Sequence, residues 1–184
     1  MRKVSSMVLR ISLLLACLFI SSLGAAQTGA SEITFTIKNA GIGVDGFFEQ
    51  TSVSFNFKPN DLGSSYFKLT IPTSTINTGI NARDKHLRKS KYFDVENYPT
   101  LSYTSTSVVR TVEGYKLLGK LTIKETTLPI EIPFRIDVID GMKYFNGAVE
   151  LDRRDYGVGK NHLILGDLVN INIKVPYSEN WNSW

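Results

Sequence analysis

The sequence LPIEIPFRIDV, residues 128–138, has an apolar side chain at every second position. This alternation is typical of a β-strand that buries one face and exposes the other. The same pattern recurs in seven further runs, which lie near residues 33–37, 53–57, 67–71, 101–103, 115–123, 145–151 and 169–175. The connections are mostly short, as antiparallel neighbours require. The sequence therefore predicts an all-β domain of eight antiparallel strands.

Turn-forming residues separate these runs and set their ends. We expect turns at 41–46, 59–61, 113–114, 140–141 and 157–166. Two prolines, Pro129 and Pro133, lie inside the cleanest run. Because proline has no N–H to donate to a neighbouring strand, this strand is expected to be an edge or to bend.

Alternation alone does not separate a β-sandwich from a closed barrel. The large apolar set, rich in aromatic residues, favours a barrel. An eight-stranded barrel has an interior that side chains can fill or that can hold one ligand. Both outcomes remain open at this point.

One long connection, residues 77–99, interrupts the alternation. Its segment 83–91, RDKHLRKSK, carries five basic residues and one acidic residue. Apolar anchors such as Ile80 and Leu87 indicate an ordered segment, and we expect a short helix around residues 80–91. The basic cluster is either a solvated loop or a collar for a polar head group or a membrane surface.

The N-terminal residues 1–26 have the basic start, apolar run and small-residue end of a secretory signal peptide. We expect a mature domain at 27–178, a polar tail at 179–184, and a periplasmic or secreted protein. An alternative is lipoprotein anchoring at Cys17, which the apolar residues after it disfavour. Removal of the signal peptide's three basic residues lowers the formal charge from +4 to +1, so no nucleic-acid partner is expected.

No catalytic motif is present in the sequence. The two histidines, His86 and His162, are far apart and have no cysteine partners after processing, so no metal or other cofactor is expected. Asp152 and Asp155 flank two arginines, which favours ion pairs over acid–base chemistry. We therefore expect a protein that is not an enzyme.

Seven ordered motifs resemble those of the YceI-like family of polyisoprenoid-binding proteins. In this sequence they are Phe35–Gly46 with the following Phe47-Phe48, Ser74–Gly79, Arg83–Leu87, Tyr92–Asp94, Tyr98-Pro99, Gly119–Lys124 and Arg154–Val158. The resemblance covers essentially the whole mature chain. It implies a lipocalin-like antiparallel β-barrel that encloses a polyisoprenoid, an isoprenoid quinone or a fatty amide.

The resemblance also places Arg83, Asp84 and His86 in the helical connection and Arg154 and Asp155 at the end of a late strand. Arg83 and Arg154 are candidates to contact a head group or to hold the barrel end together by ion pairs. A transient contact with a membrane surface and a homodimer are further expectations for its partners.

We predict that the barrel interior binds the hydrocarbon chain of the ligand. The expected wall residues are Phe35, Phe55, Phe67, Leu69, Leu117, Leu121, Ile132, Phe134 and Phe145. Gly119 and Gly147 lie among them, and we expect the missing side chain at Gly119 to leave room for the ligand or to allow curvature. The alternative is a structural or interaction domain of the cell envelope whose barrel is simply filled.

Overall fold

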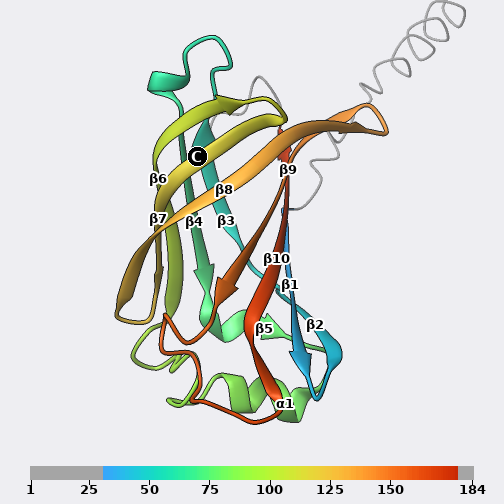
Figure 1. Cartoon of the computed structure of the whole chain (residues 1–184), viewed down its shortest axis with the longest axis vertical. Helices are drawn as coiled ribbons and strands as arrows, with labels where there is room; N and C mark the ends of the chain where they lie inside the picture. The colour runs from blue at the N-terminus through green and yellow to red at the C-terminus, as the bar shows by residue number, and fades with distance from the viewer. Residues whose placement is uncertain (1–30, 178–184) are drawn as a thin grey trace, which may run out of the picture.

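Ten strands, all paired antiparallel, form one curled sheet in the computed structural model, which describes residues 31–177 (Figure 1). The strands are β1 (Glu32–Asn39), β2 (Ile42–Phe48), β3 (Ser52–Asn56), β4 (Tyr66–Pro72), β5 (Ile76–Asn77), β6 (Thr100–Thr111), β7 (Gly114–Ile123), β8 (Thr126–Ile139), β9 (Met142–Asp152) and β10 (Leu165–Tyr177). Their order is β3-β4-β6-β7-β8-β9-β10-β1-β2-β5. The predicted lipocalin-like, antiparallel fold is confirmed. The predicted signal peptide, with Cys17, and the tail at 179–184 lie outside the described residues.

The predicted number of eight strands is wrong, because β2 and β5 were not expected. The segment assigned to a turn at 41–46 lies mostly within β2, and the turn itself is Ala40-Gly41, with φ of 51° and 81°. Gly46 stands opposite Phe35 in the neighbouring strand, and the Phe35 ring lies across it so closely that a Cβ would overlap the ring. Glycines at such positions remove the apolar alternation that identifies a strand.

One short helix, α1 (Asn81–Leu87), lies in the long connection between β5 and β6, as predicted. Two 3₁₀ turns, η1 (Leu62–Ser64) and η2 (Thr73–Thr75), complete the secondary structure of the described residues. In Figure 1, α1 lies below the sheet and the β6–β7 and β8–β9 hairpins lie at the opposite end. We call these two ends the lower end and the upper end.

The two prolines of β8 lie where this strand has a neighbour on one side. β8 pairs with β7 from Thr126 to Phe134, but its pairing with β9 begins only at Phe134. Pro129 and Pro133 therefore occupy a local edge, which confirms the expectation from the missing N–H donors.

The upper end is filled by an aromatic cluster. Ring centroids of neighbouring members lie 4.7–6.2 Å apart, many in edge-to-face geometry. The members of this upper aromatic cluster are Phe55, Phe57, Phe67, Tyr115, Phe134, Phe145 and Tyr177. All nine predicted wall residues face the interior, as the alternation indicates, and those of the cluster are packed against one another.

The space beside Gly119 is occupied by Tyr103. A Cβ at Gly119 would lie 2.5 Å from Cζ of Tyr103 and 2.6 Å from the carbonyl oxygen of Thr104. At Gly147, a Cβ would lie 2.7 Å from the carbonyl oxygen of Pro133. The expectation that the glycine leaves room for a ligand is therefore wrong, because neighbouring groups already fill that room.

We predict that Gly119→Ala lowers the free energy of unfolding by about 1–3 kcal/mol, because the added methyl group overpacks this site. Gly43→Ala is the matched control, since it is another strand glycine and its Cβ would meet only Thr36 Cγ2 at 3.5 Å. The control should be neutral or slightly stabilising. Denaturant unfolding measures both, and equal stability of the two variants would contradict the close packing of Tyr103 on Gly119.

Candidate ligand-binding site

A cavity of about 200 Å³ lies inside the sheet, between the upper aromatic cluster and α1. Its walls are almost entirely apolar. They are formed mainly by alternate residues of β1, β4, β6, β7, β8, β9 and β10, with Val44 and Phe48 of β2. The inward residues Val149, Ile171 and Ile173 are only partly covered by other atoms, because they border this space. A hollow with such walls binds hydrocarbon in preference to water.

The structure places the predicted site residues in two groups. Phe35, Leu69, Leu121, Ile132 and Arg83 line the cavity. The other predicted wall residues belong to the filled upper part and are Phe55, Phe67, Leu117, Phe134 and Phe145. Gly119 lies under Tyr103, and Arg154 is exposed outside the cavity.

Several lining residues were missed by the sequence reasoning. Ile33, Ile37, Val169, Ile171 and Ile173 occupy the inward positions of β1 and β10. The alternation in these two runs already indicated an inward face. The pattern does not predict which part of the interior, along the length of the strands, is hollow and which part is filled.

Hydrogen bonds of Arg83 and Asp84 to Thr78 tie the start of α1 to the segment that follows β5. Nε of Arg83 donates to Thr78 Oγ1 at 2.7 Å, and Nη2 donates to the Thr78 carbonyl oxygen at 2.7 Å. The buried Asp84 carboxylate accepts from Thr78 N at 2.9 Å and from Thr78 Oγ1 at 2.5 Å. This arrangement ties the helix to the chain that precedes it and gives Arg83 a structural role.

Of the two neighbouring arginines 153 and 154, Arg153 lines the cavity and the predicted Arg154 does not. Its side chain is 5% exposed and donates to the carbonyl oxygens of Val158 at 2.8 Å and Gly166 at 2.9 Å. Its Nη2 also pairs with Asp167 Oδ1 at 2.9 Å.

The loop between β9 and β10 is also joined to the connection that follows α1. Gly159 N donates a hydrogen bond to the Lys91 carbonyl oxygen at 2.9 Å.

We predict that Arg153→Ala lowers the free energy of unfolding by about 3 kcal/mol or more, because its acceptors lose a buried charged partner. Arg154→Ala is the matched control. Arg154 is exposed and pairs with Asp167 at 3.1 Å and with Asp152 at 3.8 Å, so its loss should cost about 1 kcal/mol or less. Thermal and denaturant unfolding of both variants test this, and equal losses would contradict the assigned roles.

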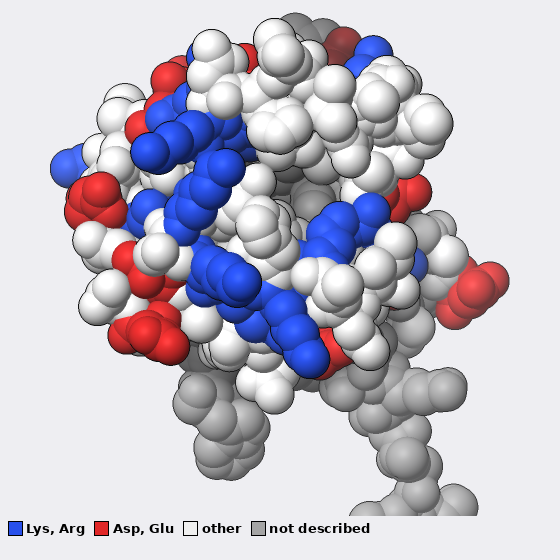
Figure 2. Space-filling view, turned by 90° about the horizontal axis from the view of Figure 1, so that it is seen from below, with Lys and Arg blue, Asp and Glu red and all other residues white. Residues whose placement is uncertain are grey.

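The lower end carries exposed basic and apolar side chains together. Seen from below, Lys and Arg side chains gather on either side of a hollow in this face (Figure 2). We define the lower rim as the exposed residues Lys85, Lys89, Lys91, Lys160, Ile42, Ile80 and Leu163. The rim therefore combines positive charge with apolar side chains.

The Tyr103 hydroxyl is a buried polar group without a hydrogen-bond partner among the described residues. Tyr103 is 4% exposed and lines the cavity. Burial raises the pKa of Tyr103 to about 12, so the hydroxyl keeps its proton at neutral pH. An unsatisfied buried donor of this kind costs about 1–3 kcal/mol.

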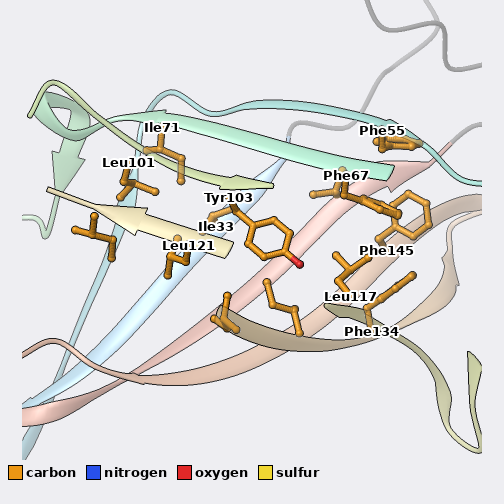
Figure 3. Packing of buried hydrophobic residues seen from close by; sticks show 14 of the residues in the cluster. Ile33, Phe55, Phe67, Ile71, Leu101, Tyr103, Leu117, Leu121, Phe134 and Phe145 are labelled. Atoms are coloured by element: carbon orange, nitrogen blue, oxygen red, sulfur yellow. The ribbon is translucent and has the colours of Figure 1, made fainter. Parts of the chain in front are cut away.

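Figure 3 shows the position of Tyr103 within the core. Its ring lies between the aliphatic residues Leu101 and Leu121 on one side and the aromatic residues Phe67 and Phe145 on the other. Tyr103 therefore marks the inner end of the cavity, where the upper aromatic cluster begins.

Among the described residues, no group of three or more histidine, cysteine, aspartate or glutamate side chains is placed to hold a metal ion. The ring of His86 lies 5.0 Å from that of Tyr92. In residues 31–177 there is also no helix of the length and apolarity needed to cross a membrane.

A curled antiparallel sheet with an apolar cavity and one short helix at its end defines a lipocalin-like fold. The sequence profile of the YceI-like domain matches residues 25–177, and the chain belongs to this family. The resemblance stated from the sequence is thereby confirmed.

Individual relatives agree with this assignment. A UPF0312 protein of Yersinia enterocolitica is 31% identical over 105 residues, which are 56% of this chain and 55% of that protein, so the chain spans about half the length of this curated relative. The structure of Burkholderia cenocepacia BcnA matches with a TM-score of 0.74 at 21% identity, covering 80% of this chain and 96% of that one. A polyisoprenoid-binding domain from Saccharophagus degradans, implicated in plant cell wall breakdown, matches with a TM-score of 0.59 at 14% identity, covering 80% and 93%. At these identities the two structures show a shared fold.

Proposed function

We propose that this protein binds the hydrocarbon chain of an amphiphile in the cavity and sequesters or carries it. The observation that carries the proposal is a hollow walled by apolar side chains inside a sheet whose other half is tightly packed. Each methylene group that leaves water contributes roughly 0.8 kcal/mol. A chain of modest length therefore gains enough free energy to bind without many polar contacts.

The size of the cavity indicates the length of chain that it accommodates. A water molecule takes up about 30 Å³ in the liquid, so a cavity of about 200 Å³ has room for on the order of seven groups of that size. A longer chain would extend through the lower end or displace side chains.

The family and its members support an isoprenoid or similar lipid as the ligand. The Saccharophagus degradans domain is a polyisoprenoid-binding domain of the same fold. A polyisoprenoid, an isoprenoid quinone and a fatty amide all offer a chain that fits apolar walls. We propose such a ligand here, taken up in the periplasm or outside the cell.

The alternative is a structural or interaction domain with a filled interior. It explains the upper aromatic cluster, but it gives no reason for partly covered Val149 and Ile171 beside an internal hollow. Extraction of the purified protein with organic solvent, followed by mass spectrometry, tests the two functions. Recovery of a stoichiometric lipid supports binding, and absence of lipid together with no uptake of any chain-like probe contradicts it.

We predict that Ile171→Trp abolishes most binding of a fluorescent polyisoprenoid analogue, by at least about tenfold, because the indole fills the cavity. Asn170→Trp is the matched control, since the preceding residue is exposed on the outer face of β10. Both proteins should keep their melting temperatures within a few degrees. Normal binding by a folded Ile171→Trp protein would show that the ligand lies elsewhere.

We also propose that the lower rim touches an anionic membrane surface while the ligand is exchanged. A ligand with a long chain resides in a lipid phase, and the rim presents lysines together with the exposed side chains of Ile42, Ile80 and Leu163. Each basic residue near an anionic surface contributes about 1 kcal/mol of attraction.

Reversal of two rim charges, Lys85→Glu with Lys89→Glu, should slow transfer of the fluorescent analogue from phosphatidylglycerol-containing vesicles by at least tenfold. Lys58→Glu with Lys68→Glu is the control, because these exposed lysines lie toward the upper end. Stopped-flow fluorescence measures both rates. The same slowing in both double variants would indicate an effect of net charge and contradict docking through the rim.

A further inference from the structure

At the inner end of the cavity, the hydroxyl of Tyr103 is the one polar group among the described lining residues. The other polar lining residues belong to the lower part of the cavity and are Asn39, Thr78, Arg83, Tyr92, Arg153 and Tyr156. Tyr103 alone stands beside the upper aromatic cluster (Figure 3). A ligand that enters from the lower end and reaches the full depth therefore has one polar residue beside it, in an otherwise apolar surrounding.

The hydroxyl has a fixed position in the wall. The ring of Tyr103 lies over Gly119, where the missing Cβ leaves space for it, and no side chain or carbonyl of the described residues accepts from its oxygen. The group is 4% exposed, so solvent outside the barrel does not reach it. Buried donors in folded proteins are almost always satisfied by protein or by bound water, and one that is not marks a place for a partner.

The chemistry of that partner follows from its surroundings. A neutral phenol is a hydrogen-bond donor, and the raised pKa keeps it neutral, so it calls for an acceptor. A carboxylate or phosphate is excluded at this depth, because a charge loses its hydration among apolar side chains. The cavity's two arginines, Arg83 and Arg153, lie in its lower part and already donate to oxygens of the protein.

We propose that the Tyr103 hydroxyl donates a hydrogen bond to a neutral carbonyl oxygen of the ligand, which enters with that carbonyl end first. This inference rests on the proposed function, because it assumes that a chain occupies the cavity. It narrows the ligand class to hydrocarbon chains that end in a ketone, quinone, ester or amide carbonyl. It also sets the orientation, with the carbonyl at the aromatic cluster and the rest of the chain toward α1.

The test combines two proteins with two probes of equal length. The proteins are the full mature chain and its Tyr103→Phe variant, which lacks only the hydroxyl. The probes are farnesylacetone, a ketone, and the hydrocarbon in which a methylene group replaces its carbonyl. Competition against the fluorescent polyisoprenoid analogue gives a Kd for each of the four combinations.

We expect the ratio of the ketone Kd to the hydrocarbon Kd to rise about 2- to 10-fold on going from the wild-type protein to Tyr103→Phe. The carbonyl stretch of isotope-labelled farnesylacetone should move to lower frequency on binding to the wild-type protein and not on binding to the variant. Tyr92→Phe is the control, because Tyr92 lines the lower part of the same cavity.

Equal ratios in wild-type protein and Tyr103→Phe would overturn the inference, and so would the same change of ratio in Tyr92→Phe. A ligand-free Tyr103→Phe protein that melts below the wild type would also overturn it, since the hydroxyl would then already have a partner. If neither probe binds the wild-type protein, the proposed function itself fails. The two failures are therefore distinguishable.

Discussion

The packing of the upper aromatic cluster is the interaction on which the rest of the molecule depends. A small domain must bury enough apolar surface to offset the entropy of ordering its chain, and a hollow interior gives up part of that surface. Here the rings from β3, β4, β7, β8, β9 and β10 fill one end of the curled sheet. This dense end lets the other end remain open around a cavity. The filled upper part of the sheet thus provides stability, and the hollow lower part provides the space for a ligand.

The strand pattern of the sequence was sufficient for the fold class and for eight of the strands. Strand β2 was missed because Gly43 and Gly46 interrupt its apolar alternation, and because Gly46 is required by the cross-strand ring of Phe35. Strand β5 has only two residues, Ile76 and Asn77, which is too short for any periodic signal. Both failures arise from contacts between strands, which a pattern along one strand does not contain.

The sequence predicted which side chains of the candidate site point inward, but not where along the strands the cavity lies. A period of two residues identifies which side chains point inward, and it treats Phe134 and Ile132 alike, although one belongs to the filled end and the other borders the cavity. The two arginines of residues 153–154 differ in the same way. Only the fold of the loop after β9 determines that Arg153 is buried against carbonyl oxygens while Arg154 stays outside. Such distinctions depend on long-range packing.

The prolines of β8 have a consequence for the behaviour of the protein at high concentration. An unpaired stretch of strand presents free N–H and C=O groups, and it can recruit a strand from another molecule into an extended sheet. Between Thr126 and Pro133, β8 is such a stretch on the side away from β7. Pro129 and Pro133 remove donors from it, so a foreign strand would find an incomplete ladder there. The opening between β8 and β9 is thereby protected against self-association and fibril growth, a safeguard built into the chain by two residues.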